Sequence, residues 1–422
     1  MSQCYRATWI LLAMSAVLII TACEVDVTIN GDSGDDSTPT PDTAAEATPT
    51  PQIAVDPSPT PDSEPDPTPA PTATPEPSPD PTPTEAPDVP EPAEVELYPI
   101  REGDRWGYID RDGTVVIEPQ WERAFEFEDG RAIVSENGLF GAIDPDGNVV
   151  VDIVYDGMAP FSDGWAPIGV GGEPGHHGTL VDADWGYVDR DGRVVIEPQF
   201  ESAGAYSEGR AAVGIDGQIG FIDRFGEVVI EPAYDWADPF SEGISRAVVD
   251  NREDVYLDRD GHVVREWGDN RVSSFENGYA SILGADGWGF MDRDFNIVVE
   301  PRFLTVRHFS DGLAAVQVEE QSWGFVNAED ELVIDVQFDE VEPFSEGLAA
   351  ARVGENMGFI DQTGYWEIPP EFDRVFPFQQ GLAVGAFGED IRYAAGGFDP
   401  LVEYGGWGYI DRSGGFVWGP ID

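Results

Sequence analysis

Acidic side chains and one histidine pair are the residues whose types and spacing suggest metal chemistry. Asp-x-Asp-Gly tetrads begin at Asp110, Asp144, Asp189 and Asp258, as at the start of a calcium loop. A calcium loop also needs further oxygen ligands and a bidentate glutamate downstream, and none follows at that spacing. Asp and Gly are equally the residues of tight hairpin turns. We interpret the tetrads as turns, with calcium as the less favoured alternative and no other cofactor predicted.

Other candidate chemistry is weaker. His176 and His177 could ligate a metal. No cysteine lies after residue 23 and no helical histidine spacing is present to complete a site, so we interpret them as a loop pair. Carboxylates are so abundant that a glycosidase pair could be chosen anywhere, which makes any chosen pair uninformative. No nucleophile elbow, phosphate-binding loop or H-E-x-x-H motif is present. The sequence therefore predicts no enzyme.

The charge of the chain limits its partners. There are 82 acidic against 22 basic residues, for a formal net charge of −60. All basic residues are arginines. Nucleic-acid binding requires cationic contacts to phosphate, so this composition argues against a nucleic-acid partner.

The first residues have the form of an export signal. Arg6 precedes an apolar run from Trp9 to Ile20, which is long enough for a signal-peptide core and too short to span a bilayer. The run ends Ile20-Thr21-Ala22-Cys23, which resembles the bacterial lipobox. The resemblance implies that residues 1–22 are a lipoprotein signal peptide and that Cys23 carries lipid, which would anchor the protein to a membrane of the bacterial cell envelope, facing outside the cytoplasm. The alternative is an ordinary secreted protein with a chance cysteine.

Residues 23–96 are predicted to be a disordered stalk. They are rich in Pro, Thr and acids and contain no basic residue. Such a segment cannot bury enough apolar surface to fold, and dense proline favours extended polyproline II structure. The stalk would act either as a spacer of required length or as a passive linker.

Residues 97–422 repeat one motif about every 35 residues. The string "WGYIDRDGTVVIEPQW" at Trp106 returns as "WGYVDRDGRVVIEPQF" at Trp185. Weaker copies are placed at Phe140, Ile219, Val255, Trp288, Trp323, Met357 and Trp407, which makes about nine units. Two intervals are longer because of insertions, at about Gly169 to Ala183 and at about Ala386 to Gly405.

Each unit contains the signals of four short antiparallel strands. "WGYID" alternates as a half-buried strand does, Asp-Arg-Asp-Gly is a turn, and "TVVIEP" is a β-branched strand that we expect to end at its proline. This applies to Pro119, Pro198, Pro232 and Pro301. A third alternating stretch ends in a Phe-Ser-Glu-Gly turn, as at Phe240 to Gly243, and a fourth strand leads into the next Trp-Gly.

The units resemble the WG-repeat family of bacterial proteins, named for this Trp-Gly pair. The resemblance implies a β-rich repeat module and no particular chemistry. We interpret the tryptophan as an inter-unit packing residue, because its replacements Phe140, Ile219, Val255 and Met357 are all apolar, and the glycine as a point of close backbone approach. The signature residues are Trp106, Gly107, Trp185, Gly186, Trp288, Gly289, Trp323, Gly324, Trp407 and Gly408.

The predicted fold is therefore all-β, with tandem antiparallel meanders. A β-propeller ring is favoured and an open β-solenoid is the alternative. Because the array begins partway through a unit, its two ends could complete one shared blade. We expect a lipid-anchored binding or interaction module for an unknown protein or glycan, with specificity in the two insertions. The alternatives are a cell-envelope glycan hydrolase on a repeat scaffold and a purely structural spacer.

Overall fold

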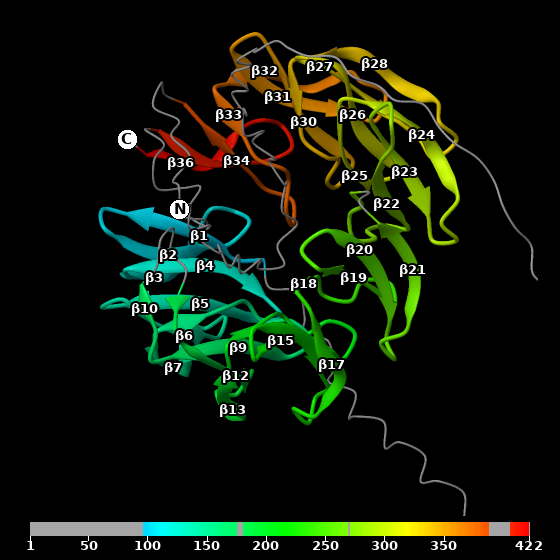
Figure 1. Cartoon of the computed structure of the whole chain (residues 1–422). Helices are drawn as coiled ribbons and strands as arrows, with labels where there is room; N and C mark the ends of the chain where they lie inside the picture. The colour runs from blue at the N-terminus through cyan, green and yellow to red at the C-terminus, as the bar shows by residue number, and fades with distance from the viewer. Residues whose placement is uncertain (1–95, 175–179, 269–270, 388–405, 422) are drawn as a thin grey trace, which may run out of the picture. The chain divides into compact units, whose positions relative to one another are not determined.

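The computed structural model describes residues 96–174, 180–268, 271–387 and 406–421. Their strands form nine antiparallel blades arranged in a ring, a nine-bladed β-propeller (Figure 1). This confirms the all-β prediction and the favoured ring, and the open solenoid is wrong. The predicted signal segment, the predicted stalk up to residue 95 and Cys23 lie outside the described residues. Within the described ranges, no helix is long and apolar enough to cross a membrane.

The blades follow one another along the chain. Blade 1 is β1–β3, blade 2 is β4–β7, blade 3 is β8, β9, β12 and β13, and blade 4 is β14–β17. Blade 5 is β18–β21, blade 6 is β22–β24, blade 7 is β25–β28, blade 8 is β29–β32 and blade 9 is β33–β36. Each blade is a meander whose strands pair in chain order, and blades 1 and 6 lack the first strand among the described residues.

The strands at equivalent positions have similar bounds. First strands are β4 (Arg123–Glu128), β8 (Gly157–Met158), β14 (Ser202–Ala203), β18 (Trp236–Ala237), β25 (Thr305–Ser310), β29 (Glu340–Val341) and β33 (Arg374–Val375). Second strands are β1 (Tyr98–Glu102), β5 (Arg131–Glu136), β9 (Trp165–Val170), β15 (Ala211–Ile215), β19 (Ile244–Val249), β22 (Tyr279–Leu283), β26 (Leu313–Glu319), β30 (Leu348–Val353) and β34 (Ala383–Ala386).

Third strands, which carry the Trp-Gly pair, are β2 (Arg105–Ile109), β6 (Leu139–Ile143), β12 (Asp184–Asp189), β16 (Gln218–Ile222), β20 (Glu253–Asp258), β23 (Trp288–Asp292), β27 (Ser322–Val326), β31 (Asn356–Asp361) and β35 (Trp407–Ile410). Fourth strands are β3 (Val115–Trp121), β7 (Val149–Tyr155), β13 (Val194–Phe200), β17 (Val228–Tyr234), β21 (Val263–Gly268), β24 (Ile297–Phe303), β28 (Leu332–Phe338), β32 (Trp366–Phe372) and β36 (Phe416–Ile421). A separate hairpin consists of β10 (Glu173–Pro174) and β11 (Leu180–Val181).

The signature glycine is required by a bulge in the fourth strand. In blade 1, Trp106 pairs with Trp121 and Tyr108 with Ile117, so Gly107 faces three residues of β3. A Cβ on Gly107 would lie closer than 3.0 Å to the backbone of Ile117 and Pro119. A Cβ added to Gly186, Gly289, Gly324 or Gly408 would lie equally close to the backbone of the opposing fourth strand. The predicted close approach therefore has a specific cause, the opposing bulge.

The predicted strand ends at the prolines are wrong. Pro119, Pro198, Pro232 and Pro301 lie inside β3, β13, β17 and β24, which continue for two more residues. Since the fourth strand is the free edge of its blade, a proline there costs no ladder hydrogen bond. Proline and a bulge also hinder pairing of an exposed edge with another chain.

The contact between consecutive blades centres on a pair of aromatic rings. The third residue of the Trp-Gly motif packs on the phenylalanine or tyrosine that opens the next blade's Phe-Ser-Glu-Gly turn, with centroids 4.7 to 5.2 Å apart at seven junctions. In blade 1 the ring is Tyr108, whose hydroxyl donates to the Phe125 carbonyl oxygen of blade 2 at 2.8 Å. Such pairs add about 0.5–1.5 kcal/mol each beyond the burial of apolar area.

A second contact, which we call the blade clamp, joins the turns of consecutive blades. The acid of one Phe-Ser-Glu-Gly turn, in a left-handed conformation, accepts a hydrogen bond from the glycine N–H of the next turn and pairs with the arginine of that next blade's Asp-Arg-Asp-Gly turn. Glu208 of blade 4 shows both contacts. Its carboxylate is 2.9 Å from the Gly243 nitrogen and 2.7 Å from Arg259 Nη2 of blade 5.

The clamp recurs around the ring. Its acids are Asp129, Asp163, Glu208, Glu242 and Glu346, and their arginines are Arg190, Arg224, Arg259, Arg293 and Arg412 respectively. The serine of the turn adds a further bond, as when Ser207 Oγ donates to the Phe240 carbonyl oxygen at 2.5 Å. The motif residues that stand out in the sequence are thus mostly inter-blade contacts.

The ring closes by side-chain packing of blade 9 on blade 1. Tyr98, Ile100 and Trp106 of blade 1 share a core with Trp407 and Tyr409 of blade 9, and blade 1 lies beside blade 9 in Figure 1. The expectation of a shared blade is wrong for the described residues, because β1 pairs only with β2 and blade 9 has its own four strands.

One copy was placed a residue out of register. Leu257 pairs with Val263 and Tyr256 with Arg265, as Ile109 does with Val115 and Tyr108 with Ile117. Asp254 therefore stands at the tryptophan position and Val255 at the glycine position. The prediction that every replacement of the tryptophan is apolar is wrong in blade 5. There the fourth strand carries no proline, and its bulge is shifted, so Val255 fits where glycine is otherwise needed.

We predict that Gly324→Ala destabilises the protein by about 1–3 kcal/mol, because the added methyl group would lie 2.5 Å from the Ile334 carbonyl oxygen. The measurement is the free energy of unfolding from denaturant titration of the full chain. Gly415→Ala is the matched control, since its nearest atom is a serine hydroxyl 3.3 Å away. Equal effects of the two substitutions would contradict the bulge explanation.

We also predict that Glu208→Ala lowers the free energy of unfolding by about 1–2 kcal/mol, since it removes a carboxylate that accepts from Gly243 and Arg259. Glu231→Ala, at an exposed position of β17, is the control and should change stability by less than about 0.5 kcal/mol. A loss no larger than that of the control would show that the clamp does not stabilise the ring.

Candidate functional site

The two insertions leave the ring from the same face. In a meander, the loops between strands 1 and 2 and between strands 3 and 4 lie at one end, and the loop between strands 2 and 3 lies at the other. The first insertion connects β9 to β12 and the second connects β34 to β35, which are both second-to-third-strand loops. We call this end of the ring the insertion face and the opposite end, with the Phe-Ser-Glu-Gly and Asp-Arg-Asp-Gly turns, the turn face.

The first insertion is anchored on the core of blade 3. Its described part includes the β10–β11 hairpin, and Leu180 packs against Trp185 and the backbone at Gly157, Gly169 and Gly172. The Gly171 nitrogen donates to Asp156 Oδ2 at 2.8 Å, which fixes the start of the loop. His176 and His177 lie outside the described residues.

The two ends of the second insertion, at Phe387 and Gly406, are joined by a hydrogen bond. The Phe387 nitrogen donates to the Gly406 carbonyl oxygen at 2.8 Å, and the Phe387 ring lies against Phe372 and Phe416 of blades 8 and 9. Blades 1 and 2 separate the two insertions on one side of the ring. Their second-to-third-strand turns are short and carry the exposed acids Glu102 and Asp104 in blade 1.

The predicted signature residues lie in the interior of the ring. Trp106, Trp185, Trp323 and Trp407 are buried and Trp288 is half-buried. They start the third strand, opposite an aromatic residue of the fourth in blades 1, 3, 6 and 7. No ligand can reach the buried tryptophan rings in this structure, so they do not form a binding surface.

The Asp-x-Asp-Gly tetrads have the hydrogen bonds of hairpin turns. Oδ1 of Asp110 accepts from the backbone nitrogens of Asp112 and Thr114, and Asp144, Asp189 and Asp258 do the same in their turns. In blade 5, Asp258, Asp260 and His262 lie close enough to hold a cation together. They are exposed turn residues whose mutual contacts follow from the turn, so they do not by themselves define a metal site.

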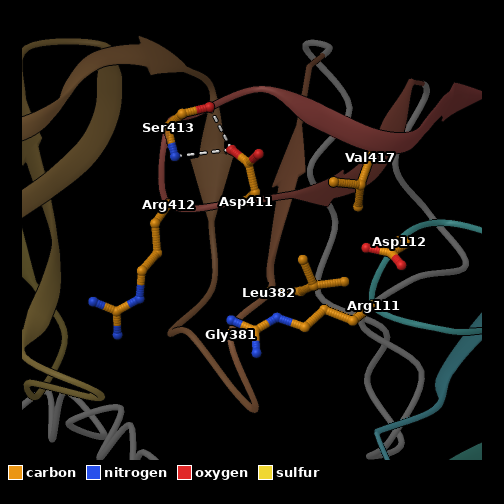
Figure 2. A pocket seen from close by; sticks show the side chains of 8 residues that line it. All are labelled: Arg111, Asp112, Gly381, Leu382, Asp411, Arg412, Ser413 and Val417. Atoms are coloured by element: carbon orange, nitrogen blue, oxygen red, sulfur yellow. Dashed lines mark hydrogen bonds between the residues drawn. The ribbon is translucent and has the colours of Figure 1, made fainter.

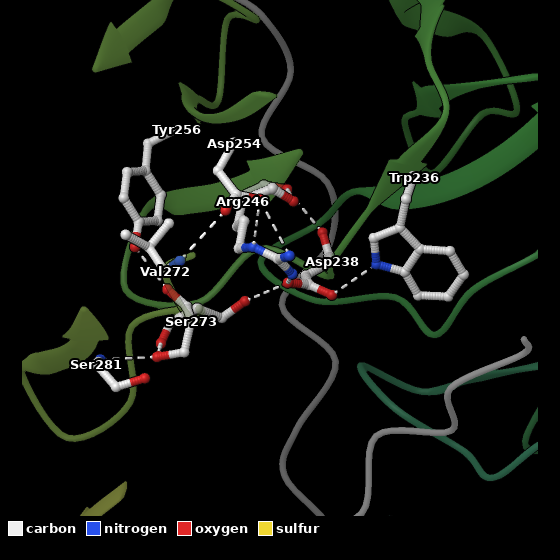
Figure 3. A network of polar contacts seen from close by, with 10 residues as sticks. Trp236, Asp238, Arg246, Asp254, Tyr256, Val272, Ser273 and Ser281 are labelled. Atoms are coloured by element: carbon white, nitrogen blue, oxygen red, sulfur yellow. Dashed lines mark hydrogen bonds and ion pairs between the residues drawn. The ribbon is translucent and has the colours of Figure 1, made fainter. Parts of the chain in front are cut away.

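Blade 5, which lost the Trp-Gly pair, has a polar network in its place (Figure 3). Arg246 donates to Asp254 Oδ1 and to Asp238 Oδ2, both at 3.1 Å. Trp236 Nε1 donates to Asp238, and Ser274 Oγ of blade 6 donates to the same carboxylate. Burial would lower the pKa of Arg246, but the charges of Asp238 and Asp254 outweigh it and raise that pKa. Both carboxylates share the one guanidinium and accept further hydrogen bonds, which suits a structural link between blades rather than a catalytic base.

A second network joins the first strands of blades 7, 8 and 9. The buried Glu342 accepts from Arg307 at 2.8 Å, and Glu340 accepts from Arg374 and Arg352 at 3.0 and 2.9 Å. Burial raises the pKa of Glu342, whereas for Glu340 the neighbouring arginines outweigh burial and lower it. These ion pairs again connect blades.

The carboxyl group of Glu128 has a pKa close to neutral pH. Burial, with the nearby charge of Glu126 adding to it, raises the pKa of Glu128 to about 7. Glu128 occupies the serine position of the blade 2 turn. Half-protonation near neutrality is a property of general acids, yet it is not sufficient evidence of catalysis on its own.

An open hollow of about 380 Å³ lies where the ring closes (Figure 2). It is on the turn face, between blades 9 and 1, and not between the insertions. Its lining residues are Arg111, Asp112, Gly381, Leu382, Asp411, Arg412, Ser413 and Val417. The sequence pattern placed Arg111 and Asp112 in the Asp110 turn but did not predict the hollow, because its lining residues become neighbours only when the ends of the array meet.

The comparisons with known proteins agree with the fold. A family model described as WG containing repeat matches residues 106–140, 140–173, 185–218, 219–252, 288–320, 323–356 and 357–384. It passes over the blade 5 copy, in which Asp254 and Val255 replace the Trp-Gly pair. No curated protein matches the chain.

Among solved structures, one titled as the crystal structure of the eukaryotic initiation factor has a TM-score of 0.56 at 8% identity and covers 78% of this chain and 96% of its own. At that identity the likeness concerns the fold alone. The crystal structure of BamB from Moraxella catarrhalis is more distant, with a TM-score of 0.37 at 11% identity, and the match covers 63% of this chain and 93% of BamB. The WD40 β-propeller domain of Doa1 has a TM-score of 0.29 at 14% identity, and the match covers 56% of this chain and 90% of that domain. The family matches cover more than half of the chain, and the chain belongs to the WG containing repeat family.

Proposed function

We propose that this protein is a non-catalytic binding module for an envelope protein or glycan, that it is lipid-anchored to a membrane of the bacterial cell envelope, and that its binding surface is the insertion face. The observation that supports this most is that both breaks in the repeat fall in the same type of loop, on the same face of the ring. The insertions add surface there without interrupting a strand, a blade clamp or an inter-blade aromatic pair. Loops on a rigid scaffold are where binding proteins vary.

The charge of this face is mixed. The exposed acids Glu102, Asp104 and Glu122 lie on its rim between the insertions, where Arg101 pairs with Asp104 and where Arg105 and Arg123 are also exposed. A rim with both signs of charge gives no strong field toward a polyanion or a polycation, which suits a neutral glycan or a protein surface of mixed charge. The buried signature tryptophans do not contribute to this surface.

The insertion face is tested by binding to a panel of envelope glycans and detergent-solubilised envelope proteins. Each insertion of the full chain is replaced by the Asp216-Gly217 turn of blade 4, and Asp260→Ser on the turn face is the control. We expect replacement of either insertion to lower retention of the bound component at least about tenfold and the control to leave it unchanged. Retention that survives both replacements would exclude this face, and the absence of any bound component would favour a structural spacer.

The anchor is tested separately by metabolic labelling with radioactive palmitate in a bacterial host. We expect the unchanged chain and Cys4→Ser to be labelled and to sediment with membranes, because Cys4 is lost with the signal peptide. Cys23→Ser should be unlabelled and leave the membrane fraction, since acyl chains supply the membrane affinity. Label that persists in Cys23→Ser would contradict lipid attachment at this residue.

A further inference from the structure

Arg111 is the one clamp arginine whose acid is missing. Arg190, Arg224, Arg259, Arg293 and Arg412 follow the first aspartate of their hairpin turns, and each pairs with the acid of the preceding blade. Arg111 holds the same position in blade 1. The preceding blade is blade 9, whose turn reads Phe378-Gln379-Gln380-Gly381, with Gln380 at the place of the acid.

No other junction keeps the arginine without its acid. At the junction of blades 7 and 8 the acid Asp311 accepts from the Gly347 nitrogen and Gln362 replaces the arginine, and at the junction of blades 6 and 7 both residues are replaced. Blade 6 has Asn277 at the acid position, and blade 7 has Ala328 at the arginine position that would face it. Asn277 instead donates to the Phe309 carbonyl oxygen at 2.8 Å. The junction of blades 9 and 1 keeps the arginine without its carboxylate, so the clamp itself does not account for Arg111.

Arg111 also lies differently from the other clamp arginines. Its guanidinium lies over Gly381, where an added Cβ would be closer than 3.0 Å, whereas nothing lies within 4 Å of that position at Gly209, Gly243, Gly278 or Gly347. Arg111 is exposed and makes no hydrogen bond or ion pair with the described part of the chain. In Figure 2 its guanidinium projects into the hollow between blades 9 and 1.

The rest of the hollow restricts what Arg111 can bind. Val417, which is half-buried, and the edge of Leu382, which is 2% exposed, give it a small apolar wall. Asp112 and Asp411 stand at its border, and hydrogen bonds from Ser413 lower the pKa of Asp411 and keep it charged. Arg412 already forms an ion pair with Glu346. The hollow therefore offers one free guanidinium, a small apolar surface and a border that repels further negative charge.

We propose that this hollow is a binding site for a monocarboxylate with a short apolar stem, such as a small organic acid or the C-terminal residue of a peptide. The carboxylate takes the place of the missing clamp acid and accepts hydrogen bonds from Arg111. In the clamp of blades 4 and 5, Arg259 holds a carboxylate in this way, with Nε and Nη2 at 2.9 and 2.7 Å from Glu208 Oε2. The apolar stem packs on Leu382 and Val417. The site is on the turn face and is independent of the function proposed for the insertions.

The test follows the arginine Nε–H signals of the full chain by NMR during titration with N-acetylvaline, with the Arg111 signal identified from its absence in Arg111→Gln. We expect a saturable shift of the Arg111 signal. N-acetylvalinamide, which lacks the carboxylate, and sulfate at equal ionic strength should produce less than about a tenth of that shift. A tetrapeptide ending in valine distinguishes the sources, since tighter binding than N-acetylvaline indicates a peptide end and equal or weaker binding a small acid.

Gln380→Glu is the decisive variant because it restores the missing acid. It should move the Arg111 signal without ligand, raise the thermal midpoint and weaken N-acetylvaline binding at least about tenfold. Arg293→Gln, at a clamp arginine outside the hollow, should leave binding unchanged. The proposal is overturned if the Arg111 signal does not respond to N-acetylvaline, if sulfate shifts it equally, or if Gln380→Glu binds as well as the original chain.

Discussion

The fold depends on how each blade holds the next one. Most positions that recur from unit to unit contact a recurring position of the neighbouring blade. Tyr108 packs on Phe127, Glu208 accepts from Gly243 and Arg259, and Ser207 donates to Phe240. A single meander of short strands cannot bury both faces of its sheet. The repeat is therefore stable only as a series, and closure through Tyr98, Trp106 and Tyr409 removes the two ends that an open array would expose.

The same constraint explains why the residues that stand out in the sequence do not form a binding surface. The Trp-Gly glycine admits the backbone of a bulged fourth strand, and the bulge with its proline protects the free edge of the blade. Blade 5 shows the limits of substitution. With its bulge shifted, Asp254 enters the tryptophan position and is neutralised by Arg246, which also contacts Asp238. A buried carboxylate is tolerated there because every charge has a partner.

Once the repeat positions are assigned to packing, the candidate binding residues are those at which the repetition fails. Two such regions are open to a ligand, whereas the departures in blade 5 are matched by the ion pairs of Arg246. One is the insertion face, where extra residues enter two loops of the same type. The other is the closure of the ring, where Arg111 lacks the acid that its counterparts have and lines a hollow with Leu382 and Val417. The regions lie on opposite faces, so occupation of one does not sterically exclude occupation of the other.

The sequence by itself determined the all-β class, the number of units and the places where the period breaks. Each of these follows from the local alternation of apolar and polar residues and from the residues of the turns. It also predicted the close approach at Gly107 and the turns at Asp110 and Asp189. It did not determine the course of the strands through Pro119, the register of Asp254, or the absence of a shared blade, since those depend on which edge is free and which strands pair. Only the closed ring brings Arg111 against Gly381, since residues 270 positions apart become neighbours through the summed rotation of nine blades and not through any local signal.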